Sequence, residues 1–279
     1  MRITPRIARP LGTMIAYGFA RIDVADDLDL AVRIGARCVE AFPHWRELPD
    51  PAVLRRLVDD RGLIIHSAHG SWGGQSIAAR RVDLGSLDPD TRRASLDDLS
   101  RCAEWLAEAG GRHLVVHPGG LSEVDEFDRR RAALIASLAL LADSVRDLGV
   151  VICVENMPPG VNPGSRMADL AAIVAELDRP EVALALDTGH ARLVGSPEDE
   201  TSAAGSRLRT THVHDNNGRQ DIHLPPGIGV IDWAAWIDAL DRIDYRGPVM
   251  LECIRQLREH PEILTDDYVA KLGELAGLG

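Results

Sequence analysis

The sequence is poor in lysine and cysteine, and each shortage narrows the chemistry that it can support. Its single lysine, Lys271, lies close to the C-terminus, so a Schiff base on a core lysine is not expected. The four cysteines are far apart and form no CxxC pair, which argues against a disulfide framework and against a thiolate zinc site. We therefore expect a reduced, cytoplasmic protein whose free cysteines are Cys38, Cys102, Cys153 and Cys253.

Long apolar runs and positive charges are also scarce. No stretch of about 18 apolar residues is present, and the first residues lack the apolar core and the cleavage site of a signal peptide. Secretion and membrane spanning are therefore not expected. Asp and Glu total 43 against 31 for Lys and Arg, a net charge of -12, so the surface as a whole disfavours a nucleic acid partner.

The remaining composition is that of one folded domain with a large core. The chain has 279 residues, of which 45% are hydrophobic and 27% charged. Short β-rich segments recur along it, and several are apolar without alternation, as in strands that are covered on both faces. The expected strands are 12–17, 37–40, 63–66, 113–117, 150–155, 182–187, 208–212 and 249–252.

Helical patterns separate these strands. One helix is expected to begin at the N-cap Asp88, which Pro89 follows, and to end before Gly110. Another ends before Gly149 and has apolar residues four, three, four and three apart, at Leu134, Leu138, Leu141, Val145 and Leu148.

Eight strand and helix units of about 35 residues each predict a fold of the α/β class, a single (β/α)8 TIM barrel over residues 1–279. A doubly wound open sheet is the alternative. Against it, no GxGxxG turn follows the first strand, and polar residues stand at strand ends all along the chain.

From the third strand onward, each expected strand ends near a side chain that can bind a metal. Any one of these residues could instead cap a helix or be a satisfied polar group. In a barrel, however, they converge on one mouth, where the carboxylates and imidazoles would repel one another or remain unsatisfied without a divalent cation or a proton-sharing network. We favour the cation. The residues are His69, His117, Glu155, Asp187, His190, His212 and Glu252.

The segment after the seventh strand adds two further candidates. Asp221 and His223 are flanked by glycines and prolines that shape a turn, so the loop is expected to fold over the mouth of the barrel. The alternative is a solvated surface loop.

Taken together, the motifs HSAH, VVHPG, VENMP, LDTGH, HVHDN and DIHLPPGIG, followed by Glu252, resemble the xylose-isomerase-like barrel superfamily. This superfamily contains sugar isomerases, epimerases and family 2 AP endonucleases. The resemblance runs from about the third strand to the eighth. It implies a metal-dependent enzyme.

The epimerase branch implies one divalent ion, Mn, Mg, Co or Zn, on Glu155, Asp187, His212 and Glu252. Glu155 and Glu252 would also be the catalytic bases of an isomerase or epimerase that acts on a sugar or polyol ketone through a metal-stabilised enediolate. His190 and Arg219 resemble the family's contacts to substrate hydroxyls. A dehydratase acting on a cyclic polyol ketone uses related chemistry and stays open.

The endonuclease branch implies up to three zinc ions and cleavage of DNA at abasic sites. Its further ligands correspond to His69, His117, His190, Asp221 and His223, and all five are present. The sequence LDTGH, where that branch usually has LDTCH, favours the sugar enzymes, in which these residues bind substrate or an auxiliary metal.

Each of three tryptophans has two alternative places in the predicted fold. Trp72 follows the third strand, so it either walls the substrate pocket or packs within its loop. Trp233 and Trp236 are expected in the core, with a homo-oligomer interface as the alternative.

Overall fold

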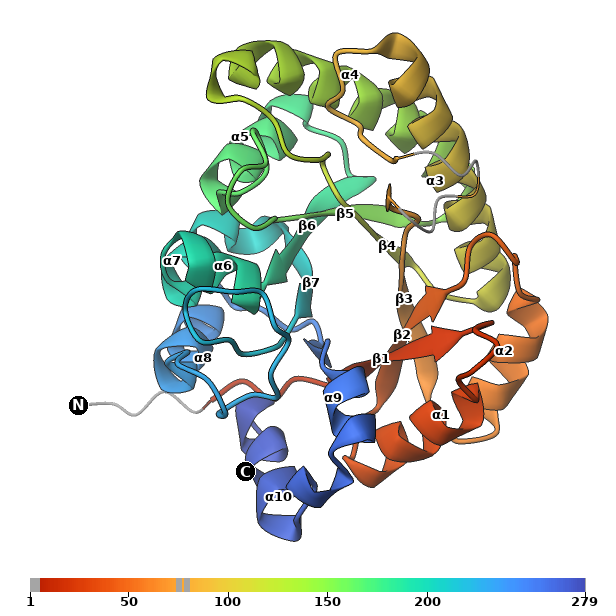
Figure 1. Cartoon of the computed structure of the whole chain (residues 1–279), viewed down its shortest axis with the longest axis vertical. Helices are drawn as coiled ribbons and strands as arrows, with labels where there is room; N and C mark the ends of the chain where they lie inside the picture. The colour runs from red at the N-terminus through yellow and green to blue at the C-terminus, as the bar shows by residue number, and fades with distance from the viewer. Residues whose placement is uncertain (1–5, 74–76, 78–80, 279) are drawn as a thin grey trace.

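Eight parallel strands form the barrel in the computed structural model, which describes residues 6–73, 77 and 81–278 (Figure 1). The strands pair in the order β7-β6-β5-β4-β3-β2-β1-β8. Val213 closes the ring, because its N–H donates to Met250 O at 2.8 Å and its carbonyl accepts from Glu252 N at 3.0 Å. The predicted (β/α)8 barrel is confirmed. Its strands are β1 (Leu11–Tyr17), β2 (Cys38–Pro43), β3 (Ile64–His69), β4 (His113–Val116), β5 (Val151–Glu155), β6 (Val182–Asp187), β7 (Leu208–His212) and β8 (Val249–Leu251).

The helices surround this ring (Figure 1). Asp88 caps α3 through bonds from the Asp90 and Thr91 amides, and Gly110 ends that helix with a φ of 90°, as predicted. The helix before Gly149 also forms. The helices are α1 (Val24–Arg33), α2 (Pro51–Asp59), α3 (Pro89–Ala109), α4 (Phe127–Val145), α5 (Met167–Leu177), α6 (Thr188–Val194), α7 (Pro197–Ala204), α8 (Trp233–Arg242), α9 (Ile254–Glu259) and α10 (Asp266–Leu275).

Two strand predictions are too short at their carboxyl ends. The prediction for β3 stopped at His66, whereas the strand continues to His69. The prediction for β2 stopped at Glu40, whereas the strand continues to Pro43. A buried hydrogen bond of 2.6 Å from the Ser67 hydroxyl to Glu40 joins the two strands and satisfies polar groups that lie inside them.

The core has two parts. A large apolar layer lies between the sheet and the helices, and Trp236 is fully buried in it, as predicted. Trp233 is partly buried and packs against the same layer. Inside the barrel is a smaller cluster of Val115, Cys153, Ala183 and Ala185, which leaves the interior beyond it to polar residues.

The predicted absence of disulfides agrees with the described residues, in which all four cysteines are buried and free. Burial raises the pKa of the Cys38 and Cys102 thiols to about 12. Among the described helices, none combines the length and the apolar character needed to cross a bilayer.

Candidate metal centre and catalytic pocket

A cavity of about 620 Å³ lies at the carboxyl ends of the strands. Its lining includes the predicted polar residues His69, His117, Glu155, His190, Asp221, His223 and Glu252. The lining also has an apolar part, the apolar wall, made by Met14, Ala16, Phe19, Ile22, Phe42, Trp72 and Ile254. Arg255, Gln256 and Arg258 complete the polar lining.

Four residues at the carboxyl ends of the strands form a compact group, and two of them, Glu155 and Glu252, line the cavity. Glu155, Asp187 and His212 are the last residues of β5, β6 and β7, and Glu252 directly follows β8. Each offers one ligand atom, and these atoms all lie within 4.8 Å of one another. His212 Nδ1 is 2.8 Å from Glu155 Oε1 and 3.0 Å from Glu252 Oε2. The structure thus brings together the four residues that the sequence assigned to one metal.

Two carboxylate oxygens in this group lack hydrogen bonds. Glu155 Oε2 and Glu252 Oε2 are buried, and imidazole nitrogens of His117 and His212 lie 3.3 and 3.0 Å from them, respectively. Neither oxygen has a hydrogen bond of acceptable geometry from the described residues. A buried, unsatisfied carboxylate oxygen is costly unless a cation binds it. Three carboxylates and one imidazole therefore suit a divalent ion, and this mixed oxygen and nitrogen set fits Mn, Mg, Co and Zn alike.

The surrounding charges favour ionised carboxylates. Burial opposes the ionisation of Glu155, but the charges of His212 and His117 hold its pKa well below the usual value. Burial likewise opposes the ionisation of Asp187, whose pKa is lowered to about 2 by His190 and His214. Both carboxylates are therefore deprotonated and available as ligands.

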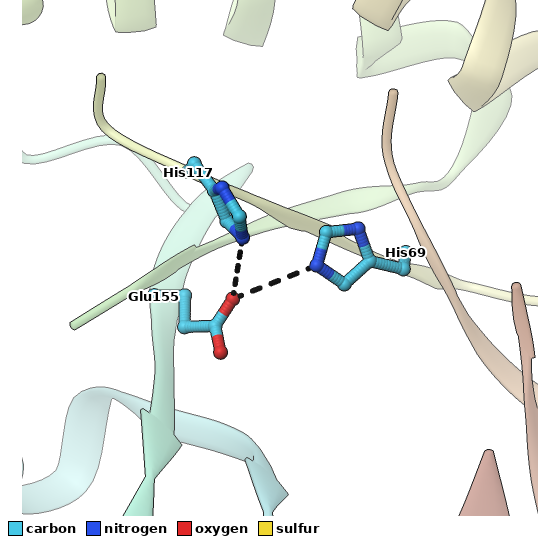
Figure 2. A group of neighbouring side chains, drawn as sticks. All are labelled: His69, His117 and Glu155. Carbon is cyan, nitrogen blue, oxygen red and sulfur yellow. Dashed lines mark ion pairs between the residues drawn. The ribbon is translucent and has the colours of Figure 1, made fainter. Parts of the chain in front are cut away.

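Two histidines contact Glu155 from the neighbouring strands (Figure 2). His117 Nε2 lies 3.3 Å from Glu155 Oε2, and His69 Nε2 lies 3.8 Å from the same oxygen. The three residues form a second group that could hold an ion. Burial and the nearby His117 lower the pKa of His69, which favours a neutral imidazole that can accept a hydrogen bond or bind a metal.

The loop after β7 folds back over the mouth, as expected, and carries the third predicted group. His190 Nε2 is 3.2 Å from Asp221 Oδ2, and His223 Nε2 is 3.5 Å from the same atom. Burial opposes protonation, yet Asp187 and Asp221 raise the pKa of His190 to about 10. The pKa of His223 is also raised to about 10, against burial, by Asp221 and Glu252.

Asp215 holds this loop in place. Its carboxylate accepts hydrogen bonds from the backbone amides of Asn216, Gly227, Val230 and Ile231 and from the Trp233 indole. Arg219 lies at the exposed tip of the loop and is not among the residues that line the cavity, so the structure does not bring it to the other predicted site residues. Trp72 does line the cavity and tilts toward His117, with ring centroids 6.2 Å apart.

Two residues of the site escaped the sequence analysis. His214 Nε2 is 3.0 Å from Asp187 Oδ2, and its ring stacks on that of His223 with the centroids 3.9 Å apart. Glu40 contacts His212 from β2. Two signals could have revealed them: His214 is two residues from His212, the spacing of one face of a strand, and Glu40 is a lone charge within an apolar strand.

Residues 28–268 match the sequence profile of the xylose isomerase-like TIM barrel family. An L-ribulose 3-epimerase of Methylomonas sp. (strain DH-1) is 28% identical over 213 residues, which cover 73% of this chain and 68% of that protein. A ketose 3-epimerase of Arthrobacter globiformis is 28% identical over 195 residues, covering 66% of this chain and 64% of that protein. The aligned part thus spans about two thirds of these relatives.

A solved structure of an L-ribulose 3-epimerase is similar over nearly the whole chain. It superposes with a TM-score of 0.74 at 20% identity, over 97% of this chain and 94% of that one. At this level of identity the similarity establishes the shared barrel.

Proposed function

Because the chain belongs to the xylose isomerase-like TIM barrel family, we propose that it is a divalent-metal-dependent isomerase or epimerase of sugars or sugar-like hydroxy-ketones. The observation that carries the proposal is the pair of glutamates, Glu155 and Glu252, which line one cavity and each keep a buried oxygen without a hydrogen bond from any described residue. The similarity to 3-epimerases supports it. The free, buried cysteines support a reducing compartment such as the cytoplasm.

The proposed chemistry is proton transfer at carbon. A divalent cation held by Glu155, Asp187, His212 and Glu252 would supply the positive charge that acidifies the hydrogen beside a ketone. Glu155 and Glu252 come from strands three apart in the ring, so they reach the substrate from different sides. One removes the proton to give the enediolate, and the other returns a proton.

The position of the returned proton decides the reaction. Return to the same carbon from the opposite face gives an epimer, whereas delivery to the neighbouring carbon interconverts a ketose and an aldose. His69 and His117 are positioned to bind substrate oxygens beside Glu155, and His190 to do so on the Asp221 side. These imidazoles would orient the hydroxy-ketone toward the two carboxylates.

Exchange in deuterated water tests the proposal. Metal-loaded protein is incubated with a panel of ketoses, and the products are analysed by mass spectrometry and NMR. We expect carbon-bound deuterium in the product, and the carbon that carries it distinguishes an epimerase from an isomerase.

A product that has lost water would instead indicate a dehydratase. A metal-loaded enzyme that exchanges no carbon-bound hydrogen in any ketose would contradict the proposal.

Cleavage of abasic DNA is the second candidate, because the groups at His69 and His117 and at Asp221 and His223 could hold further ions. A zinc cluster would supply local positive charge that the chain as a whole, at -12, does not. We expect zinc-loaded protein to leave a duplex with one abasic site intact. If the wild-type protein cleaves this duplex efficiently and both His69→Ala and His117→Ala abolish the cleavage, the endonuclease becomes the favoured function over the isomerase or epimerase.

A further inference from the structure

Glu40 is a charged residue in the barrel interior that the proposed chemistry does not use. Its side chain is fully buried. Glu40 Oε1 lies 2.7 Å from His212 Nε2, and Glu40 Oε2 accepts a hydrogen bond from the Ser67 hydroxyl at 2.6 Å. The opposite nitrogen of the same imidazole, His212 Nδ1, faces Glu155 and Glu252. His212 therefore stands between Glu40 and the candidate metal ligands.

This arrangement determines which nitrogen of His212 can bind a cation. A neutral imidazole carries one N–H, and a carboxylate can only accept a hydrogen bond from it. A cation on the candidate ligands would take the Glu155 and Glu252 oxygens, so Glu40 would be the carboxylate left to accept the one N–H of a neutral His212. That proton would then belong on Nε2, and the lone pair of Nδ1 would be left for the metal ion. A histidine ligand whose other nitrogen is held by a carboxylate has a fixed ring orientation and greater basicity.

The burial of Glu40 is hard to explain by stability alone. A fully buried carboxylate loses much of its hydration energy, and an apolar side chain of similar volume often stabilises a core at least as well. The neighbours of Glu40 instead fix the orientation of its carboxylate, because the Ser67 hydroxyl donates to one oxygen and His212 Nε2 contacts the other. A structural role would not require the carboxylate to face a metal ligand.

We propose that Glu40, held by Ser67, is a positioning residue that keeps His212 in the Nε2–H tautomer and thereby sets the affinity of the site for its divalent cation. The inference rests on the metal site of the proposed function. Glu40 itself belongs neither to the cavity lining nor to the candidate metal ligands.

The main test is the Glu40→Gln variant, with metal affinity rather than turnover as the measurement. Glutamine keeps the shape, but it can turn either its oxygen or its amide nitrogen to His212, so it no longer selects a tautomer. We expect Mn(II) to bind about 10- to 100-fold more weakly, measured by titration against a competing chelator. Ser67→Ala should weaken binding by a smaller factor, because Glu40 remains but is less firmly held.

A spectroscopic measurement separates orientation from general disruption. In the zinc-loaded protein, ¹⁵N-detected histidine spectra should show a protonated Nε2 and a metal-bound Nδ1 on His212, assigned with His212→Asn. Glu40→Gln should broaden or shift this pattern. Glu104→Gln, at an exposed residue of α3 outside the cavity lining, is the matched control and should leave both measurements unchanged.

Each outcome decides the inference. Wild-type affinity and an unchanged His212 spectrum in folded Glu40→Gln would overturn it and leave the proposed function intact. If Glu40→Gln fails to fold, Ser67→Ala decides: wild-type affinity there would overturn the inference, and weaker binding at an unchanged melting temperature would support it. A wild-type protein that binds no divalent ion would refute both this inference and the proposed metal site.

Discussion

Gly189 and His214 fit together as a pair, because a Cβ on Gly189 would overlap the His214 ring. The two residues come from different strand ends, with Gly189 in α6 and His214 after β7. His214 in turn contacts Asp187, one of the four candidate ligands. The glycine of the LDTGH motif therefore has a steric reason, since a cysteine at that position would displace the histidine that holds Asp187.

The close contact between Gly189 and His214 predicts that one methyl group added at position 189 weakens metal binding. Gly189→Ala should push His214 away from Asp187 and weaken divalent metal binding by about 10-fold or more, because a supporting contact to a ligand is lost. Mn(II) titration measures the effect. In the double variant Gly189→Ala with His214→Asn, the smaller side chain at position 214 leaves space for the methyl group added at position 189. This double variant should recover part of the Mn(II) affinity. A double variant that binds no better than Gly189→Ala would contradict the steric explanation.

Replacement of the two cavity glutamates should separate catalysis from folding. Glu155→Gln or Glu252→Gln keeps the shape of the side chain but cannot accept a proton, so kcat should fall by about 100- to 10,000-fold. Metal affinity should also fall, because each residue is a candidate ligand. Melting temperature and circular dichroism check the fold, and Glu104→Gln, at an exposed residue of α3 outside the cavity lining, is the surface control. A variant that retains most of its turnover would refute the assignment of two bases.

The sequence predicts the barrel well because its signals are local. The caps at Asp88 and Gly110 and the apolar runs of β5 and β6 each depend on a few neighbouring residues. The gathering of His212 and Glu155 on one mouth follows from the topology of any such barrel.

What could not be predicted depends on packing between distant segments. Glu40 precedes His212 by 172 residues, and only the closed ring brings them within 2.7 Å. Arg219 was expected near the substrate from the resemblance alone, but the loop that Asp215 holds places it at an exposed tip. The local conformation of a long loop is set by such contacts, which a strand pattern does not encode.

The apolar wall of the cavity predicts a preference among ketoses. Phe19 and Phe42 stack with their ring centroids 5.8 Å apart, and both line the cavity. A substrate hydroxyl placed against these two rings would lose water without gaining a good hydrogen bond from them, which costs about 1–3 kcal/mol.

We therefore expect a 6-deoxy ketohexose to have a kcat/KM about 10-fold above that of the corresponding ketohexose. Steady-state kinetics on matched pairs of sugars measure the ratio. Phe19→Ser should reduce the ratio of the two kcat/KM values, because the serine offers a hydroxyl to the substrate. Leu121→Ser, at an exposed residue outside the cavity lining, should leave the ratio unchanged. An equal kcat/KM for both members of each pair would contradict this account of the wall.

His66 predicts a loss of stability in mild acid that is independent of the metal site. Its ring stacks on that of His113 with centroids 4.3 Å apart, and its Nε2 is buried without a hydrogen-bond partner among the described residues. Burial, with a smaller contribution from the charge of His113 and against the opposing charge of Glu40, lowers the pKa of His66 to about 4. The folded protein therefore resists protonation at this position.

The sign of the effect follows from proton binding. Between pH 6.5, near the pKa of an unfolded histidine, and pH 4, the unfolded chain binds more protons at this position than the folded one, so the free energy of unfolding falls as the pH falls. The pKa shift corresponds to a loss of about 3 kcal/mol in the free energy of unfolding over this pH range, and the contribution is constant above the range.

Urea denaturation in EDTA at pH 7, 5.5 and 4 measures this loss of stability. His66→Gln should lose about 3 kcal/mol less than the wild type between pH 7 and pH 4, whereas His260→Gln, at an exposed histidine, should follow the wild type. If His66→Gln and wild type lose the same free energy, the acid sensitivity arises elsewhere, and His66 is not held neutral by its burial.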